Sequence, residues 1–201
     1  MSGVLILIPA AGASSRMRGR DKLIEEVRGK PLLRDRADMA LGIGCQVLVT
    51  LPPDRPRRTA ALADIDDPRF TRITVQDAQT GMSASLRCGA RWAMDHQADA
   101  LMILLPDLPD LTADDINFIL QSYDLKSIIR ATSEDGIPGH PVILPARLFN
   151  ALATLSGDHG ARDILRAHPV TPLALPGTRA TTDLDTPEAW DAWRSAQNKK
   201  P

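Results

Sequence analysis

The fold class of this chain is decided by the stretch Val4-Leu5-Ile6-Leu7-Ile8-Pro9-Ala10-Ala11-Gly12. Five aliphatic residues in a row, ended by a proline, are typical of a strand that is buried on both faces of a sheet. The small residues that follow leave the backbone amides open to a ligand. The opening of the chain therefore predicts a buried strand that leads directly into a binding loop.

The rest of the chain alternates short apolar runs with segments of helical spacing. Further strands are predicted at 46–50, 73–75, 100–105, 127–131 and 142–144, and helices at 32–41, 59–63, 83–93, 112–120, 145–155, 161–167 and 188–194. This alternation indicates crossover units on a mostly parallel sheet, in which ligands bind beyond the carboxyl ends of the strands. We expect one domain over residues 1–196 and a frayed tail over 197–201.

Composition limits the classes of function. The 201 residues are 43% hydrophobic and 24% charged, with a formal net charge of −1, so no basic field favours nucleic acid. Cys45 and Cys88 belong to no ligand cluster, which predicts a reducing compartment without zinc or disulfides. The first apolar run is too short for a signal peptide or a membrane span. We expect a cytoplasmic protein that does not contact a membrane.

The loop after the first strand predicts a phosphate site. Ala10, Ala11 and Gly12 allow backbone amides to approach a polyphosphate, and Arg16 and Lys22 supply positive charge. No GxxxxGK[ST] motif and no GxGxxG after the first strand are present. A flexible, solvated basic loop is the alternative interpretation.

Three acidic residues are candidates for a metal site. Asp107 follows the predicted strand at 100–105, where a carboxylate can hold Mg²⁺ against phosphate oxygens. Asp183 and Asp185 project to one side of an extended segment, so one or both could complete the site. The alternatives are a turn beside proline for Asp107 and a helix start at Thr186-Pro187-Glu188 for the later segment.

Three further segments have two interpretations each. The segment 81–87 offers helix amides and hydroxyls, from Gly81 to Ser85, to a base, ribose or phosphate, or Ser83 simply caps the helix. The segments 138–141 and 157–162 read as polar loops that could close over a second substrate. His140 and His159 have no partner visible in the sequence, and surface loops account for both.

Taken in order, these segments resemble the molybdenum cofactor cytidylyltransferases and their guanylyltransferase relatives. The family motif L-A-A-G-x-S-x-R-M-G-x-x-K compares with residues 9–22, and G-M-S-x-S-L, D-x-P, G-H-P, G-D-x-G-A-R and D-x-D-T-P-E follow at 81–86, 107–109, 139–141, 157–162 and 183–188. The chain departs from the motif at Pro9 and by one extra residue before Lys22. The match spans nearly the whole chain.

The resemblance implies a three-layer Rossmann-like nucleotidyltransferase fold and a set of residue roles. Backbone around Ala10, Ala11 and Gly12 would hold the triphosphate, with Arg16 and Lys22 neutralising it. Gly81 and Ser85 would lie near the base and ribose. Asp107, with Asp183 or Asp185, would carry Mg²⁺, so the catalytic set would be Arg16, Lys22 and Asp107.

The expected activity is Mg²⁺-dependent transfer of CMP from CTP to molybdopterin, with release of pyrophosphate. Ala10-Ala11-Gly12 favours CTP, because the guanylyltransferases usually carry Ala-Gly-Gly there. A molybdoenzyme or its maturation chaperone is the protein partner that the resemblance implies. The alternatives are GTP, another small phosphorylated acceptor such as a sugar phosphate or lactyl phosphate, a nucleotide-binding regulator without turnover, and a dinucleotide-dependent oxidoreductase.

Overall fold

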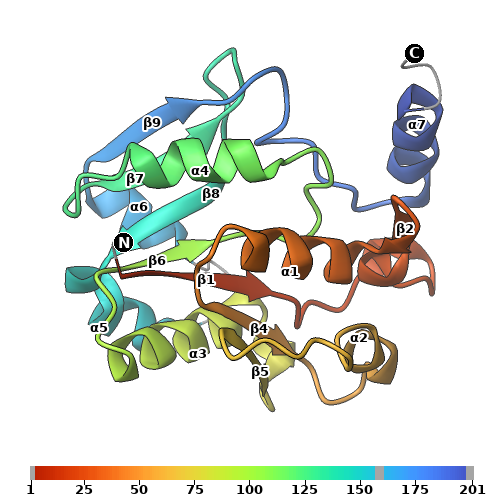
Figure 1. Cartoon of the computed structure of the whole chain (residues 1–201), viewed down its shortest axis with the longest axis horizontal. Coiled ribbons are helices and arrows are strands. Elements are labelled where there is room, and N and C mark those ends of the chain that lie inside the picture. The colour runs from red at the N-terminus through yellow and green to blue at the C-terminus, as the bar shows by residue number, and fades with distance from the viewer. Residues whose placement is uncertain (1–2, 157–160, 198–201) are drawn as a thin grey trace.

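A computed structural model describes residues 3–156 and 161–197 and shows one central sheet covered by helices on both faces (Figure 1). The seven strands follow the order β5-β4-β1-β6-β8-β7-β9. Neighbouring strands run parallel except at β8, which is antiparallel to both β6 and β7. The α/β class and the mostly parallel central sheet predicted from the sequence are therefore confirmed.

The predicted strands and helices all form, with shifted ends. The sheet strands are β1 (Val4–Pro9), β4 (Val47–Leu51), β5 (Phe70–Thr74), β6 (Ala100–Ile103), β7 (Ile128–Thr132), β8 (Pro138–Pro145) and β9 (Val170–Ala174). The helices are α1 (Leu32–Gly42), α2 (Pro56–Ala61), α3 (Met82–Asp95), α4 (Ala113–Gln121), α5 (Phe149–Ala153), α6 (Arg162–Ala167) and α7 (Pro187–Gln197).

Strand β9 and a small hairpin were not predicted. β9 contains Pro172 and lies at the edge of the sheet, paired only with β7. A proline is tolerated there because an edge strand has one side without a hydrogen-bonded neighbour. The hairpin joins β2 (Glu26–Val27) to β3 (Lys30–Pro31), which are too short to give a periodic pattern.

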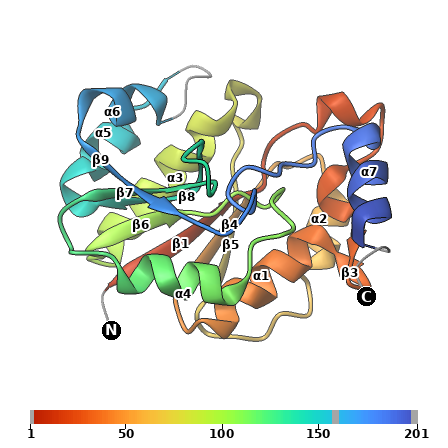
Figure 2. The same cartoon turned by 90° about the horizontal axis from the view of Figure 1, so that it is seen from above.

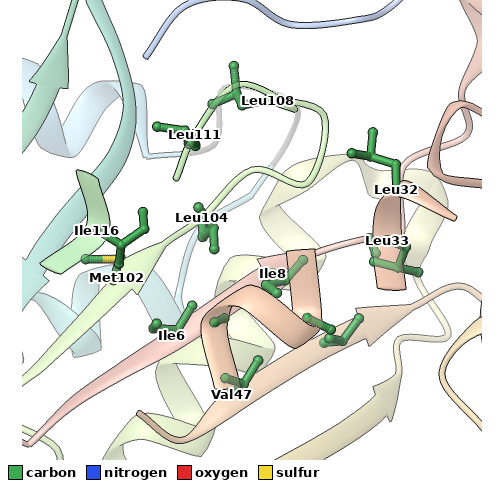
Figure 3. Close-up of a cluster of buried hydrophobic side chains, with 14 of the residues drawn as sticks. Ile6, Ile8, Leu32, Leu33, Val47, Met102, Leu104, Leu108, Leu111 and Ile116 are labelled. Atoms are coloured by element: carbon green, nitrogen blue, oxygen red, sulfur yellow. The ribbon is translucent and has the colours of Figure 1, made fainter. Parts of the chain in front are cut away.

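The side chains of the central strand β1 pack into two separate hydrophobic cores, one on each face of the sheet. Ile6 and Ile8 face the layer that holds α1 and α4, whereas Leu5 and Leu7 face the layer of α3, α5 and α6. Figure 3 shows the first core, where Ile6, Ile8 and Val47 point from the sheet toward the helix side chains. The unbroken aliphatic run in the sequence is explained by burial on both faces of the strand.

Helix ends follow the local signals in most places. Thr112 caps α4, its hydroxyl accepting from the Asp115 amide at 3.2 Å while the Asp115 carboxylate accepts from the Thr112 amide at 2.9 Å. The Thr186 hydroxyl accepts from the Ala189 amide at the start of α7. The predicted cap at Ser83 is wrong, because Gly81 occupies the N-cap position and Ser83 lies inside the first turn of α3.

Helix α7 stands beside the segment that holds β2 and β3, apart from the two helical layers (Figures 1 and 2). Arg194 of α7 pairs with Glu25 at 2.7 Å, and Arg18 pairs with Glu188 at 2.7 Å. The end of the described chain therefore packs against residues 18–27. No helix within residues 3–156 and 161–197 has the length and apolar character needed to cross a bilayer.

Gly139 of β8 is required by a close backbone approach. A Cβ atom at this position would lie 2.0 Å from the Ala180 carbonyl oxygen, and the next amide, of His140, donates to that same oxygen at 2.9 Å. The segment around Ala180 is thereby fixed against the strand. The approach leaves no space for any side chain.

We predict that Gly139→Ala lowers the free energy of unfolding by at least about 2 kcal/mol, because the methyl group overpacks rigid backbone. Urea denaturation measures the change. Gly42→Ala is the matched control, since a Cβ there meets nothing within 4 Å. Equal stability of the Gly139→Ala variant and the wild type would contradict the prediction.

Candidate nucleotide and metal site

A cleft of about 260 Å³ lies beyond the carboxyl ends of β1 and β6. Its walls come from the loop after β1, the start of α3 and the turn after β6. Five of the predicted site residues line it, namely Gly12, Lys22, Gly81, Ser85 and Asp107. Segments far apart in the sequence thus meet where parallel sheets bind their ligands.

The loop after β1 is shaped around one buried guanidinium. Arg58, on α2, has no exposed side-chain surface and donates to the Ala10 and Gly12 carbonyls at 2.6 and 2.7 Å. It also donates to the Ser14 hydroxyl at 3.0 Å and to both Asp21 oxygens at 2.7 and 2.8 Å. These bonds fix the path of the chain from Ala10 to Asp21, directly before Lys22.

The bond network also holds backbone that would otherwise be unfavourable. Ser14 and Arg18 are non-glycine residues with φ of 54° and 51°, in the left-handed region. Such residues cost about 1 kcal/mol or more each and persist where the surroundings hold them. Burial acts to raise the pKa of Asp21, but Arg58 outweighs it, so the pKa lies below its ordinary value and Asp21 stays charged at neutral pH.

Lys22 lies between two carboxylates at the rim of the cleft. Its Nζ is 2.6 Å from Asp107 Oδ2 and 2.5 Å from Asp185 Oδ1. Burial alone would lower the pKa of Lys22, but the two carboxylates outweigh it and raise the pKa above its ordinary value. Lys22, Asp107 and Asp185, which come from three distant segments, therefore lie together at one rim of the sheet.

Arg16 and Asp183 extend the same group. Arg16 pairs with the second oxygen of Asp185, although its side chain is 68% exposed. Burial acts to raise the pKa of Asp185, and Lys22 and Arg16 outweigh it, so the pKa is lowered. Asp183, two residues earlier, is exposed overall, but partial desolvation of its carboxyl group and a hydrogen bond with Asp185 raise its pKa. Asp185 is thus the better ionised of the two.

Asp107 and Asp185 could hold a divalent cation. The Lys22 ammonium lies between them, and Asp107 Oδ1 is buried with no hydrogen-bond partner among the described residues. No group of three or more His, Cys, Asp or Glu side chains within the described ranges is arranged to bind a metal. One or two carboxylates completed by substrate phosphates are a usual ligand set for Mg²⁺. The residues fit a cation that arrives with a polyphosphate.

The remaining predicted residues fall into two groups. Ala10 and Ala11 are buried, so their backbone and not their side chains could face a ligand. The segment 157–160, with His159, lies outside the described residues.

Two residues of the site were not predicted from the sequence. Gln79 lines the cleft, and Arg58 shapes the loop after β1. No local signal marks Arg58, because its role depends on contacts with residues more than 30 positions away.

The interpretation of His140 as a surface-loop residue is wrong. His140 is part of strand β8, and its Nδ1 is buried without a hydrogen-bond partner among the described residues. Burial, followed by the nearby Arg130, lowers the pKa of His140 to about 4. The segment 138–141 was read as a loop because of its prolines and glycine. It forms the first part of β8, where Pro138 pairs with Thr132 of β7 and the His140 amide donates to the Ala180 carbonyl.

This topology, with its polar residues beyond the carboxyl ends of the central strands, defines a Rossmann-like nucleotidyltransferase fold. The model of the MobA-like NTP transferase domain matches residues 6–172. The chain belongs to this family, within the nucleotidyltransferase superfamily. The family resemblance drawn from the sequence motifs is therefore confirmed.

Relatives and solved structures agree with this assignment. The chain is 31% identical over 176 residues to nicotine blue oxidoreductase of Paenarthrobacter nicotinovorans, covering 84% of this chain and 83% of that protein. It is 28% identical over 204 residues to the purine catabolism protein PucB of Bacillus subtilis, covering 94% and 95%. Its fold is similar to that of Rv0371c from Mycobacterium tuberculosis, with a TM-score of 0.78, 25% identity and full coverage of both chains. A structure of Rv0371c in complex with manganese gives a TM-score of 0.73 at 24% identity, with 98% coverage of both chains.

We predict that Arg58→Lys weakens binding of a nucleoside triphosphate in the presence of a divalent metal by tenfold or more, because an ammonium cannot reach the five oxygens that the planar guanidinium reaches. Titration calorimetry measures the affinity, and circular dichroism checks the fold. Arg57→Lys is the matched control, since Arg57 is exposed on the same helix. An unchanged affinity in the Arg58→Lys variant would show that the loop keeps its shape without the guanidinium.

We predict that Lys22→Met raises the affinity for Mn²⁺ in the absence of nucleotide by about tenfold, since two facing carboxylates lose their compensating charge. Electron paramagnetic resonance of free Mn²⁺ measures the binding. Lys30→Met is the control, because Lys30 pairs with Asp38 at the exposed surface. An affinity equal to that of the wild type would refute a metal site between Asp107 and Asp185.

Proposed function

We propose that this protein is a Mg²⁺-dependent nucleotidyltransferase that transfers CMP from CTP to molybdopterin and releases pyrophosphate. The observation that carries the proposal is the meeting of Lys22, Asp107 and Asp185 at the rim of the small cleft. Cations suited to phosphate and carboxylates suited to metal converge there from three distant segments. Membership of the MobA-like NTP transferase family supports a nucleoside triphosphate as the donor.

The cleft offers polar groups to a nucleoside. Gln79 lies in the turn before α3 and Ser85 in its first turns, where they offer amide and hydroxyl groups to a base and ribose. The choice of CTP over GTP is proposed from Ala10-Ala11-Gly12.

The proposed reaction requires charge stabilisation more than proton transfer. An acceptor phosphate oxygen forms a bond to the α-phosphorus of CTP, the bond to the bridging oxygen breaks, and pyrophosphate leaves with the electron pair. Lys22 and Arg16 would leave their carboxylate partners and bind phosphate oxygens. When bound, Mg²⁺ would neutralise charge on the triphosphate from Asp107 and Asp185. The acceptor phosphate is already ionised at pH 7, so no general base is needed.

The ion pairs of Lys22 and Arg16 with the carboxylates are suited to such an exchange of partners. The cations that would hold the triphosphate are paired with the carboxylates that would hold the metal. Neither set is left with uncompensated charge before the substrate arrives. When a polyphosphate and Mg²⁺ bind together, Lys22 and Arg16 would pair with phosphate and the carboxylates would pair with the metal. Each charge keeps a partner of opposite sign, so nucleotide and metal should bind cooperatively.

A second candidate function follows from one relative. The protein at 31% identity is named nicotine blue oxidoreductase, so a chain of this family carries an oxidoreductase name. If this chain reduced a substrate with a dinucleotide, it would bind NADPH and oxidise it in the presence of an electron acceptor. Binding of NADPH in place of CTP with Mg²⁺ would favour that function over nucleotidyl transfer.

Pyrophosphate release from a panel of CTP, GTP, ATP and UTP, with molybdopterin and with sugar phosphates as acceptors, tests the proposal. We expect activity with CTP and molybdopterin, and a loss of 100-fold or more in Lys22→Ala and Asp107→Ala, because each removes charge stabilisation at the transferring phosphate. Lys30→Ala and Asp114→Ala are matched controls at exposed positions. Near-wild-type turnover in either site variant would refute the role assigned to that residue, and CTP binding without pyrophosphate release would favour a regulator.

A further inference from the structure

A second cavity of about 680 Å³ lies beside the small cleft and shares Met82 with it. It is enclosed by the face of β7, β8 and β9, the first turns of α3, and α6. None of the predicted phosphate or metal residues lines it. A molecule in this cavity would lie next to a nucleotide in the cleft without occupying the same space.

The cavity is positively charged. Arg130, Arg162 and Arg166 line it, and its described lining contains no carboxylate. The Arg130 Nε donates to the Gly139 carbonyl at 3.1 Å, which holds the guanidinium against β8. Burial is the larger cause that lowers the pKa of Arg130, and the positive charge of Arg162 is the second. The two guanidinium groups are therefore close enough to repel each other. Two facing cations of this kind favour an anion between them.

The strand register places Arg130 away from Lys22 and Asp107. Arg130 pairs with Val142, and Val142 pairs with Ile103, so Arg130 is level with Ile103 on the sheet. Asp107 lies four residues beyond Ile103, in the turn that follows β6. The anion that Arg130 and Arg162 would bind is therefore separate from a phosphate that reacts at Lys22 and Asp107.

The rest of the described cavity lining is mostly apolar, and its polar side chains are His140 and Thr132. Leu86 and Val142 line the cavity, and so does His140, which lies two residues before Val142 and therefore on the same face of β8. A neutral imidazole at pH 7 can donate or accept one hydrogen bond without adding charge. A mostly apolar body with a polar group would satisfy both features.

We propose that this cavity is the acceptor subsite and that the acceptor carries a second anionic group, remote from the reacting one, which Arg130 and Arg162 bind. The rest of the acceptor would be mostly apolar, with a polar group that meets His140. The inference rests on the proposed function, because it describes the acceptor of that reaction. It disfavours acceptors whose only anionic group is the reacting phosphate, because these would leave Arg130 and Arg162 without a partner.

Fluorescence titration with pterin-6-carboxylate and with neutral 6-methylpterin tests the subsite without requiring turnover. We expect the wild type to bind the carboxylate at least tenfold more tightly than the neutral compound. Arg130→Gln and Arg162→Gln should each remove this preference, whereas Arg147→Gln, an exposed control, should keep it. Arg162 is exposed on α6, so its variant tests the charge without disturbing the strand.

Three results would overturn the inference: no binding of the carboxylate to the wild type at millimolar concentration, no preference for it, or a preference that survives in both arginine variants. Displacement of the probe by CTP with Mn²⁺ would also overturn it, because the two sites are separate. Failure of nucleotidyl transfer is detected independently, as absent pyrophosphate release. If the protein binds the carboxylate probe as expected but releases no pyrophosphate, the subsite is supported and the proposed nucleotidyl transfer is refuted.

Discussion

The candidate site depends on the burial of one positive charge. Arg58 is removed from water on α2, and a buried guanidinium is tolerated only when its donors are satisfied. The chain meets this demand by wrapping residues 10–21 around it, with two carbonyls, one hydroxyl and one carboxylate as acceptors. The loop after β1 is therefore not a flexible basic segment. Its shape is set by electrostatics, and Lys22 follows directly from the last residue that Arg58 holds.

This constraint explains how charged residues from three parts of the chain come to share a small volume. Asp21 is fixed by Arg58, so Lys22 is directed toward the turn after β6 and the segment before α7. Asp107 is carried there by the end of a buried strand, and Asp185 by the extended segment that leads into α7. Helix α7 in turn packs against residues 18–27 through ion pairs at both of its ends. The rim is closed by contacts from the beginning, middle and end of the described chain.

The two cavities divide the polar groups between two tasks. The small cleft holds the cation and carboxylate groups that suit a polyphosphate with a divalent metal. Among the described residues, the larger cavity is lined by arginines and by no carboxylate, together with His140, whose pKa is lowered, and aliphatic walls. Met82, at the start of α3, lies between them. A transfer reaction needs two substrates side by side, and this division of charge and shape offers a separate place to each.

The sequence by itself determined the strands buried on both faces, the order of motifs, the family, and the acids and cations that follow strand ends, because periodicity and small-residue loops are local properties. It did not reveal Arg58, Gln79 or the cavity role of His140, and it placed a cap at Ser83 where Gly81 stands. The sequence predicts a loop at His140 because prolines and a glycine surround it, whereas pairing of Pro138 with β7 and the bond from the His140 amide to the Ala180 carbonyl make the segment part of β8. Tertiary structure decided these points because burial and charge partners come from residues distant in the sequence, which no local pattern records.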